Sequence, residues 1–169
     1  VLVLGAGKIG ALVSGLLAEA GDYQVQLADV SGDTAASVAR AHDHRTLTAV
    51  ALDGTDPAAL ARELEAHPVD AVISSLPFYC NVAVAQAARD HDLHYFDLTE
   101  DVEVTRAVRA IAEGAQTAFV PQCGLAPGFI SIAANELISH FDELRSVKLR
   151  VGALPQHPNN VLKYSLTWS

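Results

Sequence analysis

Hydrophobic residues in the first two-thirds of the chain follow two alternating patterns. Apolar runs too short for a helix are each followed by a stretch with apolar residues three and four positions apart, as in an amphipathic helix. The expected strands are 1–4, 25–30, 48–52, 69–74, 94–98 and 117–121. The expected helices are 9–20, 34–41, 57–66, 81–90 and 102–113. Strands and helices that alternate in this way form a parallel sheet with right-handed crossovers, so the pattern predicts a doubly wound α/β fold.

The pattern changes after the sixth expected strand. A loop rich in glycine and proline leads to an expected helix over 129–141. Two amphipathic strands are expected at 147–151 and 162–168, because apolar and polar residues alternate there. We therefore divide the chain into a first domain, 1–124, and the beginning of a second α/β domain with a mixed sheet, 125–169. Since the chain starts and ends inside such patterns, we expect it to be the first part of a longer protein.

Composition narrows the classes of protein that remain. Half of the 169 residues are apolar, which excludes disorder, and no apolar run approaches the ~20 residues that span a bilayer. The formal net charge of −9 argues against a nucleic-acid surface. Cys80 and Cys123 are too few for a disulfide framework, so we expect a reducing, cytoplasmic location and two small buried side chains. No metal site is expected, because His91 and His94 straddle a helix end and a strand start and no further ligand completes the set.

A glycine-rich motif separates the first strand from the first helix. Residues 5–10 have the sequence G-A-G-K-I-G, which fits the pattern G-x-G-x-x-G. Gly5 permits a tight turn, Gly7 lets the backbone approach a pyrophosphate, and Gly10 permits close packing of helix on strand. Phosphates would then lie at the helix N-terminus, where free N–H groups and the helix dipole favour negative charge. The motif in this position predicts a Rossmann-type domain that binds a dinucleotide.

Two acidic residues at strand ends refine this prediction. Asp29 follows Gly10 by 19 residues, close to the spacing of the carboxylate that binds the adenosine ribose. Because that carboxylate would repel a 2′-phosphate and no arginine follows it closely, we expect NAD rather than NADP. Asp53 ends the third strand and either accepts from the adenine amino group or serves only as a turn residue.

Loops at the carboxyl ends of the later strands are expected to hold the reacting groups, because ligands of doubly wound sheets bind there. Ser75, Leu76 and Pro77 are expected to line the nicotinamide ribose. Tyr79 and Asp97 are candidates for proton transfer or for binding a substrate amine, although an acidic helix start would also explain Asp97. The complete expected cofactor set is Gly5, Gly7, Lys8, Ile9, Gly10, Asp29, Val30, Asp53, Ser75, Leu76 and Pro77.

Five motifs occur in one order along the chain. They are G-A-G-K-I-G at 5–10, S-L-P at 75–77, G-L-A-P-G at 124–128, G-A-L-P at 152–155 and L-K-Y-S-L-T-W-S at 162–169. The set resembles the saccharopine dehydrogenase (saccharopine reductase) family and its lysine 6-dehydrogenase relatives. The resemblance implies a Rossmann domain, an inserted α/β domain that holds substrate and mediates dimers, a C-terminal return to the first domain, and hydride transfer at a carbon–nitrogen bond of an amino acid. Together with the cofactor expected from Asp29, this gives the hypothesis of an NAD-dependent oxidoreductase that acts on the CH–NH group of an amino acid.

Two positions depart from the saccharopine reductase pattern. Ala126 stands where those enzymes usually have Asp, and Val151 where they tend to have Cys, which is closer to the lysine 6-dehydrogenase type. Lys163 is a candidate to pair with a substrate carboxylate, with a solvated strand face as the alternative. A homodimer is expected to bury the apolar face of 162–168, which 147–151 can cover only in part.

Two other functions compete with this hypothesis. A non-catalytic domain that senses NAD would show the same glycine motif, and NAD turnover with an amino acid would separate the two. A short-chain alcohol dehydrogenase is disfavoured, because that class has Tyr-x-x-x-Lys, whereas Ala83 follows Tyr79 at that spacing.

Overall fold

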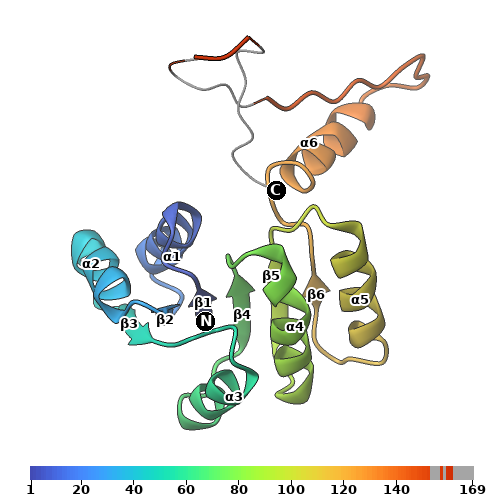
Figure 1. Ribbon diagram of the computed structural model, residues 1–169. Coiled ribbons are helices and arrows are strands. Elements are labelled where there is room, and N and C mark those ends of the chain that lie inside the picture. The colour runs from blue at the N-terminus through green and yellow to red at the C-terminus, as the bar shows by residue number, and fades with distance from the viewer. Residues whose placement is uncertain (153–156, 158, 162–169) are drawn as a thin grey trace.

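The computed structural model describes residues 1–152, 157 and 159–161. Six parallel strands form one sheet in the order β3-β2-β1-β4-β5-β6 (Figure 1). The strands are β1 Leu2–Leu4, β2 Val25–Asp29, β3 Leu47–Ala51, β4 Ala71–Ser74, β5 His94–Asp97 and β6 Phe119–Val120. The helices are α1 Lys8–Ala20, α2 Gly32–His42, α3 Pro57–Ala66, the 3-10 turn η1 Phe78–Cys80, α4 Asn81–Asp90, α5 Val102–Ala112 and α6 Phe129–Ile138. The predicted doubly wound α/β fold is confirmed.

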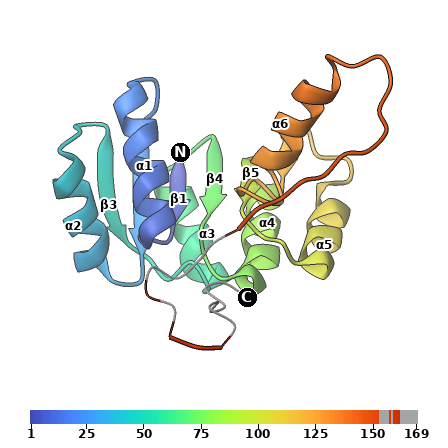
Figure 2. The same ribbon diagram turned by 90° about the horizontal axis from the view of Figure 1, so that it is seen from above.

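The sheet carries helices on both faces, and the alternation within the central strand shows why. Helices α1 and α2 cover one face of the sheet, and α3, α4 and α5 cover the other (Figure 2). Leu2 and Leu4 pack with residues of α3, α4 and α5, whereas Val3 packs with residues of α1 and α2. All three side chains are buried, because a strand flanked on both faces needs apolar residues at every position. The order of strands reverses between β1 and β4, and in such folds ligands bind at the carboxyl ends of the strands at this point.

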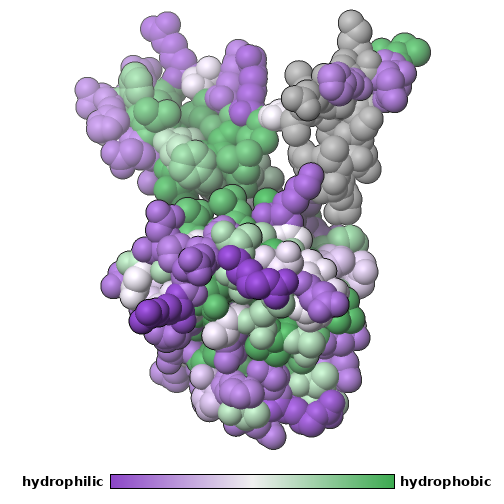
Figure 3. All heavy atoms as spheres, turned by 90° about the vertical axis from the view of Figure 1, so that its left-hand side faces the viewer, coloured by the Kyte–Doolittle hydropathy of each residue, from purple (hydrophilic) through white to green (hydrophobic). Residues whose placement is uncertain are grey.

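The region after β6 differs from the prediction. Helix α6 ends earlier than expected and has no buried residue, and the predicted strand over 147–151 is wrong, since these residues form no regular structure. A strand forms only where a neighbour accepts its backbone hydrogen bonds, and within the described part of the chain no segment pairs with 147–151. The expected strand over 162–168 lies outside the described residues. Figure 3 shows apolar side chains at the surface of the lobe above the sheet domain, where α6 lies. The large exposed apolar residues here include Phe129, Ile132, Leu137 and Phe141.

The length and polarity of the helices show whether any of them could span a membrane. Among residues 1–152, 157 and 159–161, every helix is too short or too polar to cross a bilayer.

Candidate dinucleotide site

The glycine loop between β1 and α1 has the shape that its three glycines predict. Gly5 has a φ of +96°, a conformation that L side chains rarely adopt. A Cβ on Gly10 would lie 1.8 Å from the carbonyl oxygen of Gly5, so only glycine lets α1 approach β1 this closely. A Cβ on Gly7 would have nothing within 4 Å, because this part of the loop faces open space. Backbone at Gly7 is therefore accessible to a ligand.

The N-terminus of α1 is open in the same place. Gly7 is its N-cap residue, so no side chain caps the helix, and its first turn contains no acidic residue. The first N–H groups of a helix lack partners within the helix, and together with its dipole they attract an anion. The loop and the helix start therefore fit a pyrophosphate, with Gly7, Lys8 and Ile9 nearest to it.

Asp29, at the end of β2, contacts the glycine loop. Its Oδ2 accepts a hydrogen bond of 2.8 Å from the N–H of Ala6, and its Oδ1 accepts one of 2.9 Å from the N–H of Ser31. The carboxylate is only partly buried. Since each carboxylate oxygen can accept more than one hydrogen bond, the hydroxyl groups of a ribose can still bind here.

Ser75 joins the loop after β4 to the glycine loop. Its hydroxyl lies 2.9 Å from the carbonyl oxygen of Leu4 and 3.0 Å from that of Gly5. It also lies close to Gly10, where a Cβ would be 2.7 Å from Oγ. Ser75, which is only partly buried, thus holds the loop of Leu76 and Pro77 beside the glycine loop.

A cleft of about 320 Å³ opens at the carboxyl ends of β1, β2 and β3. It contains members of the expected cofactor set from four separate segments, namely Gly5, Asp29, Val30, Asp53, Leu76 and Pro77. Tyr79 and residues absent from that set complete the lining, namely Leu4, Ala28, Leu52, Gly54 and Thr55. Gly54 and Thr55 could have been found from the sequence, because they follow Asp53 at the carboxyl end of a strand.

Asp53 itself forms a tight turn. Its Oδ1 accepts from the backbone N–H of Thr55 at 2.9 Å and from the hydroxyl of Thr55 at 2.6 Å. These hydrogen bonds, chiefly the one from the hydroxyl, lower the pKa of the exposed Asp53 carboxyl. The turn role foreseen for Asp53 is therefore present, and the same side chain also lines the cleft.

Asp97 has a different environment from the one expected of a catalytic acid. It is fully buried, and its Oδ2 accepts a hydrogen bond of 2.7 Å from the hydroxyl of Tyr95. Its Oδ1 accepts from the backbone N–H groups of Thr99 at 2.9 Å and Gln122 at 3.1 Å. Burial, followed by the hydrogen bond to Asp97, raises the pKa of Tyr95 far above its usual range. The carboxylate thus fastens the loops after β5 and β6 and has no surface that could contact a substrate.

Two of the three catalytic candidates, Tyr79 and Asp97, therefore do not lie in one site. Tyr79 is exposed on the rim of the cleft, whereas Asp97 lies beneath the loops. Lys163, the third candidate, is outside the described residues. The sequence did not reveal a buried pair of polar side chains near Asp97. The hydroxyl of Ser74 donates to Oδ1 of Asn81 at 2.7 Å, and the hydroxyl of Tyr95, which donates to Asp97, also lies 3.4 Å from the carbonyl oxygen of Asn81.

The cysteines also differ from each other. Cys80 is buried, as expected, but Cys123 is exposed, so the prediction for Cys123 is wrong. Cys123 follows the two-residue strand β6, which lies at the edge of the sheet in the part of the chain that the structure describes. In the part of the chain that the structure describes, no three His, Cys, Asp or Glu side chains gather as ligands for a metal ion.

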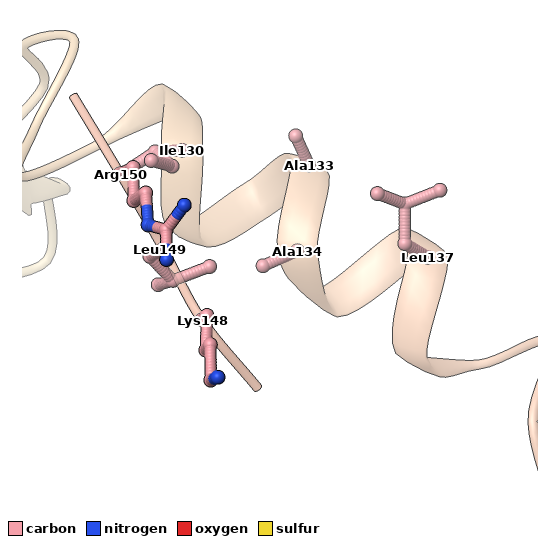
Figure 4. Close-up of a pocket in the computed structure, with 7 residues that line it drawn as sticks. All are labelled: Ile130, Ala133, Ala134, Leu137, Lys148, Leu149 and Arg150. Atoms are coloured by element: carbon pink, nitrogen blue, oxygen red, sulfur yellow. The ribbon is translucent and has the colours of Figure 1, made fainter. Parts of the chain in front are cut away.

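A second hollow, of about 410 Å³, lies against α6. Figure 4 shows Lys148, Leu149 and Arg150 running alongside the helix, with Ile130 and Ala134 on the facing turns. Its walls are mainly aliphatic, and its two cations come from a segment without regular structure. No residue of the glycine loop lines this hollow.

The fold and the glycine loop define a Rossmann-type dinucleotide-binding domain. Residues 1–120 match the family described as the saccharopine dehydrogenase NADP-binding domain, and the chain belongs to this family. The resemblance seen in the sequence motifs is confirmed.

Similar proteins agree with this assignment. Across 175 aligned residues covering the whole chain, it is 25% identical to mitochondrial alpha-aminoadipic semialdehyde synthase of Rattus norvegicus, of which it spans 18%. The solved structure of apo histidine-tagged saccharopine dehydrogenase (L-Glu forming) from Saccharomyces cerevisiae matches with a TM-score of 0.71 and 25% identity, over 82% of this chain and 30% of that chain. A myo-inositol dehydrogenase from Corynebacterium glutamicum, with a TM-score of 0.59 and 22% identity over 82% of this chain and 40% of that one, shares the fold. The chain thus spans less than a third of the length of the rat synthase and of the yeast dehydrogenase.

Proposed function

We propose that this chain is the cofactor-binding part of an NAD-dependent oxidoreductase that acts on the CH–NH group of an amino acid. The observation that carries the proposal is the open start of α1 beside Gly7, with the carboxylate of Asp29 fastened to the same loop. When bound, NAD accepts a hydride from the carbon that bears the nitrogen.

The residues of this chain would hold and orient the dinucleotide. The N–H groups at the start of α1 would bind the pyrophosphate, and Asp29 would bind the adenosine ribose. Leu76 and Pro77 would form the wall of the site beside the glycine loop. We propose NAD as the cofactor, because the negative charge of the Asp29 carboxylate would repel a 2′-phosphate. The family description names NADP, so the choice between the two is the first point to test.

The substrate class follows from the resemblance and from two side chains. We propose a simple amino acid or diamino acid such as lysine rather than saccharopine, because Ala126 and Val151 offer no proton-transfer group. Loss of one positioned proton-transfer group costs roughly 10²–10⁴-fold in rate. We further propose that residues 125–169 begin the domain that holds substrate, and that the whole protein is a cytoplasmic homodimer.

The experiment is NADH formation by the full-length protein with L-lysine, other amino acids and saccharopine. We expect kcat/KM for L-lysine to exceed that for saccharopine by at least tenfold. Equal or better turnover of saccharopine would contradict the substrate proposal. Tight NADH binding without turnover of any amino acid would favour a non-catalytic NAD sensor.

A further inference from the structure

Asp97 binds the chain after β6 through its backbone as well as through its side chain. The carbonyl oxygen of Asp97 accepts a hydrogen bond of 2.7 Å from the N–H of Cys123. Its Oδ1 accepts from the preceding N–H, that of Gln122, at 3.1 Å. Both bonds run from the last residue of β5 to the residues just after β6. One fully buried aspartate thus holds two consecutive backbone groups of the neighbouring loop.

The backbone of Gln122 has a conformation that needs such support. Its φ is +64°, in the left-handed region that residues with a side chain occupy uncommonly. A residue in such a conformation persists where the surrounding structure holds it in place, and the hydrogen bond to Asp97 fixes its N–H here. Asp97 therefore stabilises the turn that the chain makes after β6.

The turn at Gln122 packs directly against the start of α6. A Cβ on Gly128, whose φ is +129°, would lie 2.7 Å from the carbonyl oxygen of Gln122 and closer still to that of Gly124. The carbonyl oxygen of Gly124 also accepts from the N–H of Phe129, the first residue of α6, at 2.9 Å. Direct contacts therefore run from Asp97 through this turn to α6, which lies above the sheet in Figure 1.

Helix α6 is not held to the sheet by apolar packing in the part of the chain that the structure describes. It has no buried residue, and none of its residues packs with the two apolar clusters that flank the sheet. Packing of an apolar face is what usually stabilises a helix in a protein. The position of α6 relative to the sheet therefore depends on the loop over 121–128, and that loop is held by Asp97.

The same edge of the sheet carries the loops that we assign to the cofactor. Strand β4 lies between β1 and β5, and Ser74 at its end pairs with Asp97. Leu76 and Pro77 follow Ser74 closely, and residues 125–169, which we propose to begin the substrate-holding domain, follow the turn at Gln122. A misplacement of about 1 Å between reactants, caused by a change far from the chemistry, can lower a rate roughly 100-fold.

We propose that Asp97 is a positioning residue. By holding Gln122 and Cys123 it sets where the chain leaves the dinucleotide domain, and so where the substrate lies relative to the bound cofactor. The inference rests on the proposed function, since it concerns the alignment of the same two reactants. It replaces proton transfer and the binding of a substrate amine as the role of Asp97. Because Asp97 acts by accepting from backbone N–H groups, an uncharged acceptor of the same shape suffices.

Two substitutions of Asp97 separate positioning from proton transfer. Asp97→Asn keeps an oxygen that can accept from Thr99 and Gln122, and its NH₂ group can donate to the hydroxyl of Tyr95. Asp97→Ala removes all three side-chain hydrogen bonds.

Both variants are compared with the wild type as full-length proteins, with NAD and the amino acid that the wild type turns over fastest, which we expect to be L-lysine. With kcat expressed per NADH-binding site, so that unfolded protein does not count, Asp97→Ala should lower kcat about 10- to 100-fold. Asp97→Asn should keep kcat within about threefold of the wild type. The Kd for NADH should change no more than about threefold in either variant, because Asp97 does not line the cleft.

Tyr95→Phe is the matched control for lost stability. It removes the hydrogen bond to Oδ2 of Asp97 but leaves both bonds to Oδ1, one of them from the turn at Gln122. It should therefore weaken the fold, as Asp97→Ala does, and yet keep kcat within about threefold of the wild type.

Gly128→Ala disturbs the same contacts from their other end and leaves the buried carboxylate untouched. Its Cβ would meet the carbonyl oxygens of Gln122 and Gly124. This variant should lower kcat about tenfold or more without a change in the Kd for NADH. It tests the inference even if Asp97→Ala does not fold.

Hydrogen–deuterium exchange of the full-length protein gives a readout that does not depend on activity. Peptides from residues 121–138 should exchange at least about tenfold faster in Asp97→Ala than in Tyr95→Phe, because the loop can then open locally without global unfolding. In Asp97→Asn these peptides should exchange as in the wild type.

The outcomes separate the inference from the proposed function. A kcat that falls as far in Asp97→Asn as in Asp97→Ala would restore proton transfer by Asp97 and overturn the inference, while the proposed function stands. Wild-type kcat in a folded Asp97→Ala or in Gly128→Ala would also overturn the inference alone, as would equal exchange of 121–138 in Asp97→Ala and Tyr95→Phe. Absence of NADH formation by the wild type with every amino acid tested would overturn both.

Discussion

The N–H of Ala6 donates a hydrogen bond of 2.8 Å to Oδ2 of Asp29. Ala6 lies in the loop between β1 and α1, and Asp29 is the last residue of β2, so this contact joins that loop to the end of β2. The same carboxylate accepts from Ser31 through Oδ1 at 2.9 Å, just before α2. Asp29 therefore shapes the loop that would receive the pyrophosphate as well as the site for the ribose.

Substitution of Asp29 tests the choice of cofactor. We expect the wild type to bind NADH at least ~10-fold more tightly than NADPH, since a like charge opposes the 2′-phosphate. Asp29→Ser should narrow that gap, chiefly by weakening NADH binding, because it also removes the acceptor for Ala6. Asp33→Ser, an exposed change in the first turn of α2, is the matched control and should keep the preference. Equal dissociation constants for the two cofactors in the wild type would refute the argument.

Gly7 and Gly10 should fail in different ways when each is changed to alanine. Gly7→Ala places its Cβ in open space, so the free energy of unfolding should change by about 0.5 kcal/mol or less. NADH affinity should fall, because the methyl group lies where the pyrophosphate approaches. Gly10→Ala drives its Cβ into the carbonyl of Gly5 and should destabilise the domain by about 1–3 kcal/mol or more. Calorimetry and NADH titration on both variants provide the comparison. Full NADH affinity in a folded Gly7→Ala variant would contradict the site.

Removal of the Tyr95 hydroxyl should weaken the fold. The hydroxyl is buried and donates to Asp97, so Tyr95→Phe leaves a buried carboxylate with one donor fewer, at a cost of about 1–3 kcal/mol. Urea unfolding at neutral pH measures this difference. Tyr23→Phe, at an exposed tyrosine, is the control and should change stability by no more than about 0.5 kcal/mol.

The same tyrosine should make stability depend on pH in alkaline solution. In the folded state the pKa of Tyr95 is raised, whereas in the unfolded chain it is about 10. Above that pH the unfolded state loses the proton and the folded state retains it, so stability falls as pH rises, by at most about 1.4 kcal/mol per unit from this group. The advantage of the wild type over Tyr95→Phe, measured by urea unfolding, should therefore shrink between pH 9 and pH 11. A constant advantage across that range would mean that Tyr95 ionises normally in the folded protein.

The strands, the helices and the glycine loop of the first domain could be predicted because their signals are local. The apolar run ending at Leu4, the G-x-G-x-x-G motif and the spacing to Asp29 each depend on a few neighbouring residues. The strand at 147–151 could not be judged in this way, since alternation shows only that a segment would suit a sheet and not that a partner is present.

The side-chain environments of the later loops were also beyond the sequence. An aspartate at the end of a strand looks the same whether its oxygens face solvent or, like those of Asp97, face Tyr95 and the N–H of Gln122, 25 residues away. The position of Tyr79 depends on η1, a short turn that apolar periodicity does not signal. Exposure of Cys123 depends on its place at the edge of the sheet, which strand order determines.

The hydroxyl of Ser75 links stretches of chain that are 70 and 71 residues apart. Leu2 pairs with Gln26 in β2 and with Val72 in β4, so the central strand has one near and one distant partner. Closing a longer loop costs more conformational entropy before any contact is gained, and we expect the first three strands to assemble before β4 docks. The loop of Leu76 and Pro77 arrives only with that docking. A nascent chain halted before this step would thus have a partial sheet but no complete cleft, so that competence to bind a dinucleotide reports the docking of β4.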